Sequence, residues 1–410
     1  MSDLRSWTWL PFFLMNGAAF MTAIQLPPDR RRLMYAPIIY GTGALSAHMS
    51  SYSHLFLGKI LRHEHFASLY QLTHILLDIF PEIWGITVCY GLCHMTIVLY
   101  ISPVRAPSWI LAYKLWLDPR RQTDLAKPLR RCTFSDRTFF VMRQILKAIL
   151  GWAFGLYIMF LVIKAGPTAE DFATPRQVFL RRIPITLYDI QIRYFGKAFV
   201  FISEDSHHHI PITLRDIQFR CASVFGWNLV TYLIYNTCHI LSSILFVGIL
   251  CLDTPQEFPP LFGSPLEAYS IRRYWGRFSH RITVPFSAVS GKAITKQWNL
   301  PPRTEKVLII LWTFFLSAVC HTVAEWSVGE YSRAKTYSHF YFYFANFCAG
   351  AVEAFGLPLL ERVWKTGRFR EILWSSAGRR IAGYIWVFCF LFWVSPKGQY
   401  PDIFEAFSNA

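Results

Sequence analysis

Two groups of polar side chains in the second half of the chain have the residue types and the spacing to do chemistry. A basic-aromatic run reads Arg272-Arg273-Tyr274-Trp275-Gly276-Arg277-Phe278-Ser279-His280-Arg281. His321 follows 41 residues after His280, deep inside an apolar stretch from Lys306 to Glu325. An ionisable side chain inside a membrane span is costly to bury, so it is by default a functional-site hypothesis. The two groups together predict chemistry done in or beside a bilayer.

His321 is the candidate base. On a helix it shares a face with Ser317 and Glu325, which lie four residues away on either side. A carboxylate at that position would hold the imidazole tautomer that leaves one ring nitrogen free, and imidazole is the usual group for taking a proton from an attacking alcohol. The alternative that the sequence leaves open is a histidine hydrogen-bonded to a neighbouring helix.

The basic-aromatic run suits an anion. If the run is helical, Arg273, Arg277 and either His280 or Arg281 line one face. Guanidinium groups match phosphate geometry, so this face would fit an anionic cofactor such as the phosphates of coenzyme A. Tyr274, Trp275 and Phe278 on the remaining surface would seat the segment in the membrane interface. An amphipathic helix held by lipid headgroups is the alternative.

The composition places these groups in a polytopic membrane protein. The 410 residues are 53% hydrophobic and only 16% charged, whereas a soluble domain carries about 25% charged residues. We predict an all-α fold with eight membrane spans and additional amphipathic interfacial helices. The expected spans are 7–25, 35–57, 72–101, 143–164, 219–252, 306–324, 338–361 and 381–400. The N-terminal apolar run is interpreted as a first span that is not cleaved.

The charges of the connecting segments fit this count. Segments 26–34, 102–142, 253–305 and 362–380 carry a combined net charge of +15, and the segments between them carry −1. With eight spans the two sets alternate sides, which predicts that the basic set is cytosolic. Since the basic residues of the +16 chain gather in loops, no nucleic-acid partner is expected. We treat 1–410 as one membrane domain.

Other polar residues are interpreted as structural. Eight of the nine cysteines fall inside apolar spans without zinc-type spacing, so packing is expected and no metal. The run His207-His208-His209 is expected to be a solvated loop, because three consecutive histidines point in different directions on any regular structure. Glu353 lies inside the seventh expected span, where it would line a reaction chamber or pair with a basic group.

The two motifs resemble those of a known family. The basic-aromatic run is similar to the Phe-Trp-Gly-Arg-Arg-Trp-His-Gln signature of wax-synthase-type membrane-bound O-acyltransferases, and 260–265 resembles its lead-in. Ser-Ala-Val-Cys-His (317–321) resembles the Ser-Gly-x-x-His of the same family. Ser279 and Ala318 depart from it, standing where the family has Trp and Gly. The resemblance runs from about Arg215 to the end, so 215–400 is the expected acyltransferase core. Within the family, the motifs most resemble those of fungal O-acetyltransferases of terpenoid and meroterpenoid pathways.

The resemblance implies roles for these residues. His321 would be the catalytic base and His280 the second polar active-site residue, with Glu325 and Ser317 in support. The cofactor-binding set would be Arg273, Tyr274, Trp275, Gly276 and Arg277. Acetyl-CoA would be a co-substrate, and no cofactor would be permanently bound. A lipophilic alcohol would be the acceptor. The membrane would be that of the endoplasmic reticulum. Wax-ester synthesis from long-chain acyl-CoA is the alternative enzyme, and a membrane transporter or lipid carrier is the alternative outside the enzyme class. A membrane terpene cyclase would need acidic proton donors, for which Asp78, Glu82 and Glu353 are dispersed candidates.

Overall fold

The protein is helical throughout the part that the structure describes. This computed structural model describes residues 8–51, 67–117, 132–164, 214–279, 283–327, 333–363 and 376–408. Within these ranges every element is a helix and none is a strand, so the predicted all-α class is confirmed.

The long helices are α2 (Trp9–Gln25), α3 (Ala36–Ser50), α5 (Ala67–Thr96), α6 (Trp109–Leu117), α7 (Phe134–Lys164), α10 (Leu214–Ser243), α12 (Thr283–Thr295), α13 (Pro302–Ser327), α14 (Arg333–Val363) and α16 (Ser376–Ser408). Short helical turns join them: η1 (Arg30–Tyr35), η3 (Ile97–Ile101), η7 (Ile244–Ile249), η8 (Pro255–Glu257), η9 (Pro265–Glu267), α11 (Ile271–Arg273), η10 (Tyr274–Phe278) and η11 (Lys296–Trp298).

Five stretches of helix in the described ranges are long and apolar enough to cross a membrane. They are Pro81–Ile101, Phe134–Ile158, Ile217–Ile249, Pro302–Ser327 and Ala377–Tyr400. Each of the eight expected spans overlaps a helix within the described ranges, but α2 and α3 have only 17 and 15 residues. The seventh expected span lies in α14, whose tyrosines, asparagine and histidine make it less apolar. The protein is therefore an integral membrane protein, and the count of eight spans stays a prediction.

The outer surface of α7 shows why the fold needs a bilayer. Large apolar side chains along this helix remain exposed, among them Phe139 (72%), Ile149 (60%), Phe154 (57%) and Phe160 (61%). A soluble monomer rarely exposes a contiguous apolar surface of this kind. Lipid chains are the surroundings that would cover it without an energetic penalty.

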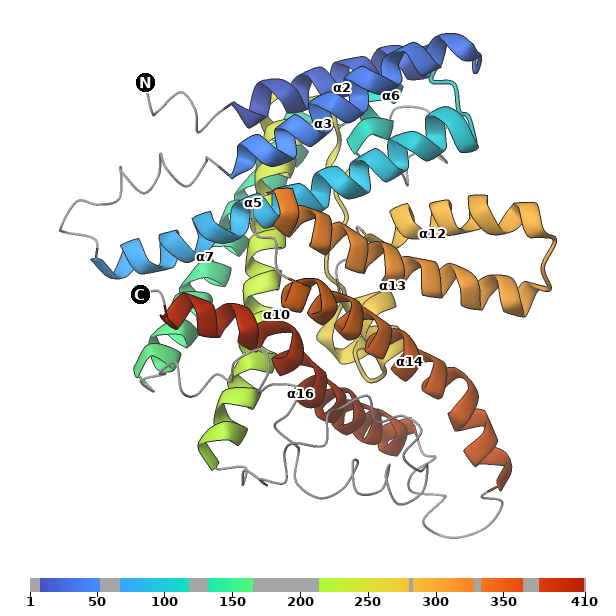
Figure 1. Cartoon of the computed structure of the whole chain (residues 1–410). Helices are drawn as coiled ribbons and strands as arrows, with labels where there is room; N and C mark the ends of the chain where they lie inside the picture. Colours follow the sequence, from blue (N-terminus) through green and yellow to red (C-terminus); the bar gives the residue numbers. More distant parts are fainter. Residues whose placement is uncertain are drawn as a thin grey trace.

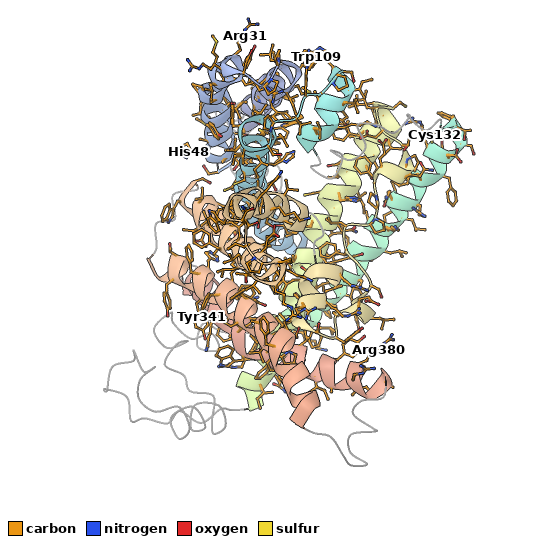
Figure 2. The ribbon with its side chains drawn as sticks, turned by 90° about the vertical axis from the view of Figure 1, so that its right-hand side faces the viewer. Arg31, His48, Trp109, Cys132, Tyr341 and Arg380 are labelled. Atoms are coloured by element: carbon orange, nitrogen blue, oxygen red, sulfur yellow. The ribbon has the colours of Figure 1, made fainter. Side chains whose placement is uncertain are left out.

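The helices pack in three groups (Figure 1). Helices α2 and α3 run side by side and pack with α6 around a core that contains Phe20, Ile24 and Leu115. Helix α13 lies at the centre and packs against α5, α12 and α14. Helices α10, α14 and α16 pack around η10 in the third group. Figure 2 shows Trp109, Cys132 and Arg380 toward one side of the molecule and His48 and Tyr341 toward the other.

The sequence fixes the hairpin that leads into α13. Helix α12 ends in η11, and Asn299 then adopts a left-handed conformation with φ 46° before two prolines. Asparagine tolerates this conformation at a helix end, and proline at the first helical position suits the start of the next helix. Helix α13 therefore runs back along α12 and carries His321 toward its far end.

A close approach between α5 and α13 fixes the other side of this helix. A Cβ atom built on Gly85 would lie 3.0 Å from the Cα atom of Ala324, so only glycine fits there without a shift. Cys89 and Cys93 of α5 pack against the buried Cys320 of α13. The nine cysteines are all free thiols, and the packing role expected for Cys89 and Cys93 is confirmed.

Candidate active site

Three helices meet around His321. Helix α13 ends at Ser327, α14 begins at Arg333, and α5 (Ala67–Thr96) packs on α13 with its most apolar stretch from Pro81 onward. Glu82 stands at the start of the apolar part of α5, His321 in the last third of α13, and His339 in the second turn of α14. Because α13 packs on both α5 and α14, these side chains converge at one end of the bundle.

The carboxylate that faces His321 belongs to Glu82. The Nδ1 atom of His321 lies 3.5 Å from the Oε1 atom of Glu82, and the two side chains are 23% and 36% exposed. A carboxylate accepts from an N–H, so this contact favours the tautomer with the proton on Nδ1 and leaves Nε2 as an acceptor. From the sequence, Glu82 was named only as one of three dispersed acidic residues and was not paired with His321.

Glu325 contacts a different imidazole from the one expected. Its Oε1 atom lies 2.7 Å from the Nε2 atom of His339, and the two side chains are 7% and 14% exposed. Spacing along α13 put Glu325 on the face of His321, but α14 brings a second histidine into reach of the same carboxylate. Direct hydrogen bonding of Glu325 to His321 is therefore replaced by bonding to His339. The ring centroids of the two histidines are 5.4 Å apart.

Ser317 is hydrogen-bonded into the helix packing. Its hydroxyl donates to the carbonyl of Thr313 at 2.9 Å, so the Tyr90 hydroxyl, 2.6 Å away, donates to Ser317 in turn. These bonds tie α13 to α5 one turn before His321. The supporting role predicted for Ser317 stays a prediction, and its hydrogen bonds to Tyr90 and Thr313 are structural.

The basic-aromatic run is helical, as expected, but as an unusual short helix. One turn of α-helix, α11, continues into the π-helix η10, and the Ser279 amide closes it on the Tyr274 carbonyl at 2.7 Å. Short π-helical segments occur frequently at functional sites. The Gly263 amide donates to the Phe278 carbonyl at 3.0 Å, which holds the run against the lead-in segment 260–265.

Glu353 anchors the start of this helix. Its Oε1 atom accepts from the Ile271 amide at 2.5 Å and from the Trp386 indole at 2.8 Å, and its Oε2 atom accepts from the Arg272 amide at 3.1 Å. The first amides of a helix have no partner within it, and a carboxylate there also complements the helix dipole. Of the two roles left open for Glu353, neither is seen in these three bonds, which anchor the run instead.

Arg273 and Arg277 share one face, as the sequence predicted. Both guanidinium groups pair with the carboxylate of Glu267, Arg277 at 3.2 Å. Arg273 also lies over the Tyr269 ring, 4.4 Å from its centroid. Their side chains remain 30% and 59% exposed. Two cations on one carboxylate leave a net positive charge at the surface, which suits a phosphate.

The aromatic residues of the run pack inward against other helices, not on the outer surface of the run where they were expected. Tyr274 is 4% exposed, and Trp275 and Phe278 pack with it in the core between α10, α13 and α14. Tyr274 donates to the side-chain oxygen of Asn228, and the Trp275 indole donates to Asn346 at 2.7 Å. Burial raises the pKa of Tyr274 above its usual range, against the opposing effect of the Asn228 hydrogen bond. Internal partners for these polar atoms explain why the side chains turn inward.

Aromatic rings connect the run to His321. The Tyr343 ring lies 5.3 Å from the His321 ring and 6.3 Å from the Trp275 ring, centroid to centroid. Ala318, one turn before His321, is in the same core cluster as Tyr274. Trp227 packs edge-on against Phe342 there. The two sequence motifs thus meet in one place, although Gly276 itself has open space around it.

Some predicted residues fall outside the described ranges. His280 is one of them, and the run His207-His208-His209 is another, so the roles expected for them stay predictions. Within the described ranges no cluster of three or more His, Cys, Asp or Glu side chains could hold a metal ion.

Glu82 and His339 are the residues of this centre to which the sequence assigned no catalytic role. Both are ionisable side chains, Glu82 midway along α5 and His339 in the second turn of α14. In the predicted topology, the start of the third expected span, the end of the sixth and the start of the seventh lie on one side of the membrane. Ionisable residues near these three span ends are the signal that could have found them.

The fold and the site define an integral membrane protein with imidazole–carboxylate pairs beside a basic, aromatic helix. Residues 258–345 match the Membrane bound O-acyl transferase family, so the resemblance drawn from the two motifs is confirmed over this segment. The match contains the run, Glu267 and the two histidines His321 and His339.

Three similar curated proteins are named acetyltransferases. Acetyltransferase ple2 of Rhodocybe pseudopiperita is 31% identical over 124 residues, covering 29% of this chain and 32% of the relative. Acetyltransferase aurG of Calcarisporium arbuscula is 30% identical over 170 residues, 39% of this chain and 37% of the relative. Acetyltransferase atnC of Arthrinium sp is 29% identical over 180 residues, 43% and 40% respectively. The chain thus spans only about a third to two fifths of the length of these relatives. No solved structure matches the chain.

Proposed function

We propose that the protein is a membrane-bound O-acyltransferase that transfers an acetyl group from acetyl-CoA to a hydroxyl group of a lipophilic terpenoid or meroterpenoid. The observation that carries the proposal is the contact of His321 with Glu82, set beside the basic-aromatic run through the Tyr343 ring. The similarity to fungal proteins named acetyltransferases supports acetyl as the transferred group.

His321 acts as the general base. With the Glu82 carboxylate 3.5 Å from its Nδ1 atom, His321 uses Nε2 to take the proton of the acceptor hydroxyl as the oxygen attacks the thioester carbonyl. The new C–O bond forms, the C–S bond breaks, and the sulfur leaves with the bonding electrons and ends as the thiol of coenzyme A. Glu82 is a positioning residue, because it holds the tautomer that leaves Nε2 free.

The basic surface binds the donor. Arg273 and Arg277 contact the phosphates of acetyl-CoA, which arrives from the cytosolic side on which the basic loops are expected. Glu353 fixes the helix that carries them. The alcohol enters from the bilayer, and the membrane is that of the endoplasmic reticulum.

Microsomes that contain the wild type or His321→Ala test the reaction. Each is supplied with labelled acetyl-CoA or palmitoyl-CoA and a panel of terpenoid and fatty alcohols, and ester product is counted. His239→Ala is the matched control, since His239 lies on α10 against Phe258 and outside the centre. We expect acetyl esters of terpenoids from the wild type and the control and none from His321→Ala.

The other outcomes separate the alternatives. Palmitoyl esters alone would replace the proposal by wax-ester synthesis. Uptake of an alcohol without covalent change would favour a carrier. Full activity of His321→Ala would refute the assignment of the base even if the reaction is confirmed.

A further inference from the structure

Tyr343 is a buried tyrosine whose hydroxyl takes no part in holding the described fold together. The residue is 7% exposed and belongs to the core between α10, α13 and α14. In the part of the chain that the structure describes, its oxygen has no hydrogen-bond partner. A buried tyrosine hydroxyl usually finds a partner, because an unsatisfied polar group in an apolar core costs free energy. This hydroxyl therefore needs an explanation other than packing.

Neighbouring tyrosines of the same region show the contrast. Tyr274, in the same core, donates to the side-chain oxygen of Asn228. Tyr341, two residues before Tyr343 on α14, accepts from the Lys397 ammonium at 3.1 Å. Both of these hydroxyl groups connect helices, whereas the hydroxyl of Tyr343 connects none within the described ranges.

Tyr343 lies between the base and the basic-aromatic run. Its ring is 5.3 Å from the His321 ring and 6.3 Å from the Trp275 ring, centroid to centroid. Its hydroxyl also interacts electrostatically with the Glu82 carboxylate, which contacts His321. The side chains of His321 and Glu82 are 23% and 36% exposed, so a substrate can reach the pair beside this tyrosine.

We propose that Tyr343 is a second catalytic residue, whose hydroxyl donates a hydrogen bond to the carbonyl oxygen of the acyl donor. This inference rests on the proposed function and deepens it. An acyl group that extends from a donor held by the run toward His321 passes Tyr343, so the hydroxyl meets the donor carbonyl. Rings whose centres are 5.3 Å apart can place a base and a hydrogen-bond donor around one reacting carbonyl group.

The chemistry of a phenol suits this task. A tyrosine hydroxyl keeps its proton at neutral pH, so it is a donor in every turnover. Negative charge develops on the carbonyl oxygen only as the alcohol attacks, and a fixed donor in a site with little water stabilises that charge. The hydrogen bond is therefore stronger in the transition state than in the bound substrate, which raises kcat more than it lowers KM.

The atoms balance without a further reactant. The hydroxyl proton of the alcohol moves to Nε2 of His321, the C–O bond forms, and the carbonyl electrons move onto the oxygen that faces Tyr343. When the carbonyl is restored, the C–S bond breaks, and the sulfur takes the proton from His321. Tyr343 keeps its own proton throughout, so the centre returns to its starting state.

The test compares wild type, Tyr343→Phe and Tyr341→Phe in microsomes. Labelled acetyl-CoA is the donor, and the acceptor is the alcohol of the panel that the wild type acetylates fastest. For each protein kcat and both KM values are measured. A fluorescent fusion gives the amount of folded protein by gel filtration and Tm in detergent. Tyr341→Phe is the matched control, because it removes a hydroxyl from the same helix that is bonded to Lys397 instead.

The two variants should behave in opposite ways. Tyr343→Phe keeps the ring and removes only an oxygen without a partner in the described fold, so Tm and the amount of folded protein should match the wild type. Its kcat should fall about 10²–10³-fold, with little change in either KM. Tyr341→Phe should keep the wild-type kcat but have a lower Tm, because Lys397 loses an acceptor.

Three results would overturn the proposal. One is a Tyr343→Phe enzyme with wild-type kcat. Another is a fall in activity that follows a fall in Tm and in folded protein, which would show a structural hydroxyl. The third is a rise in KM for the alcohol at constant kcat, which would show that Tyr343 binds the acceptor.

The same data separate this inference from the proposed function. Ester formation that is lost in His321→Ala but unchanged in Tyr343→Phe would leave the proposed function standing and refute only the second residue. Absence of ester formation by the wild type would refute both.

Discussion

Removing the carboxylate of Glu353 should release the start of the basic-aromatic helix. In Glu353→Ala the amides of Ile271 and Arg272 and the Trp386 indole all lose their acceptor. Ile271 is fully buried, so water cannot replace the lost partner there. Leaving one buried group unsatisfied costs about 1–3 kcal/mol. With three donors of differing exposure, we expect Glu353→Ala to lower the free energy of unfolding by about 3–5 kcal/mol.

Glu353→Gln gives a graded comparison. Its amide oxygen can still accept from Ile271 and Trp386, but its NH₂ group would face the Arg272 amide in place of Oε2. The expected loss is about 1–2 kcal/mol, because one charge-assisted bond is replaced by an unfavourable contact. Val352→Ala is the matched control, since the neighbouring Val352 is 59% exposed on the same helix.

Thermal unfolding in detergent and KM for acetyl-CoA measure the two consequences. A change of 1 kcal/mol moves Tm by about 2–4 °C in domains of 150–250 residues and by less in a larger chain. We expect Tm to fall by several degrees in Glu353→Ala and by less in Glu353→Gln, with KM rising in the same order because Arg273 and Arg277 lose their fixed position. Unchanged Tm and KM in Glu353→Ala would show that the anchor does not hold this helix.

Three further predictions concern other parts of the fold. Gly85→Ala should reduce kcat and Tm together, because the added Cβ would push α5 away from Ala324 and move Glu82 away from His321. Gly41→Ala is the control and should leave both quantities unchanged, because Gly41 has open space around it. Arg32→Met should lower Tm, because the buried guanidinium donates to the carbonyls of Ile24, Leu26, Leu99 and Val104. Burial lowers the pKa of Arg32 at this site. A wild-type Tm in the variant would contradict this role. Tyr274→Phe should reduce the loss of stability that the wild type shows above about pH 10. The raised pKa of Tyr274 favours the neutral form in the folded state, so stability is intact below that pH and falls as the unfolded chain ionises, which unfolding curves at pH 8 and 11 would detect.

The sequence predicted much of the fold because the apolar length that marks a membrane helix lies within one continuous segment. Apolar length predicted the five described stretches that are long and apolar enough to cross a membrane, and each of them is helical. Helical spacing also placed Arg273 and Arg277 on one face, where both now pair with Glu267. Apolarity alone did not settle the span count, because α14 mixes apolar and polar residues along its length.

The environment of the run was predicted less well. Tyr274 and Trp275 have the composition of an interfacial segment, yet Asn228 and Asn346 supply buried acceptors that draw them inward. Those acceptors come from α10 and α14, far along the chain in both directions. No local pattern indicates where such acceptors will stand.

By itself, then, the sequence determined the membrane class, the helices and the two motifs, since each depends on composition or on spacing within one segment. Only the tertiary structure decided that Glu82 faces His321 and that Glu325 turns to His339. The physical reason is that helical periodicity sets which residues share a face, whereas the packing of α5 and α14 on α13 sets which side chains meet that face. Glu325 lies four residues from His321, yet it bonds His339, because α14 brings that imidazole within hydrogen-bond distance.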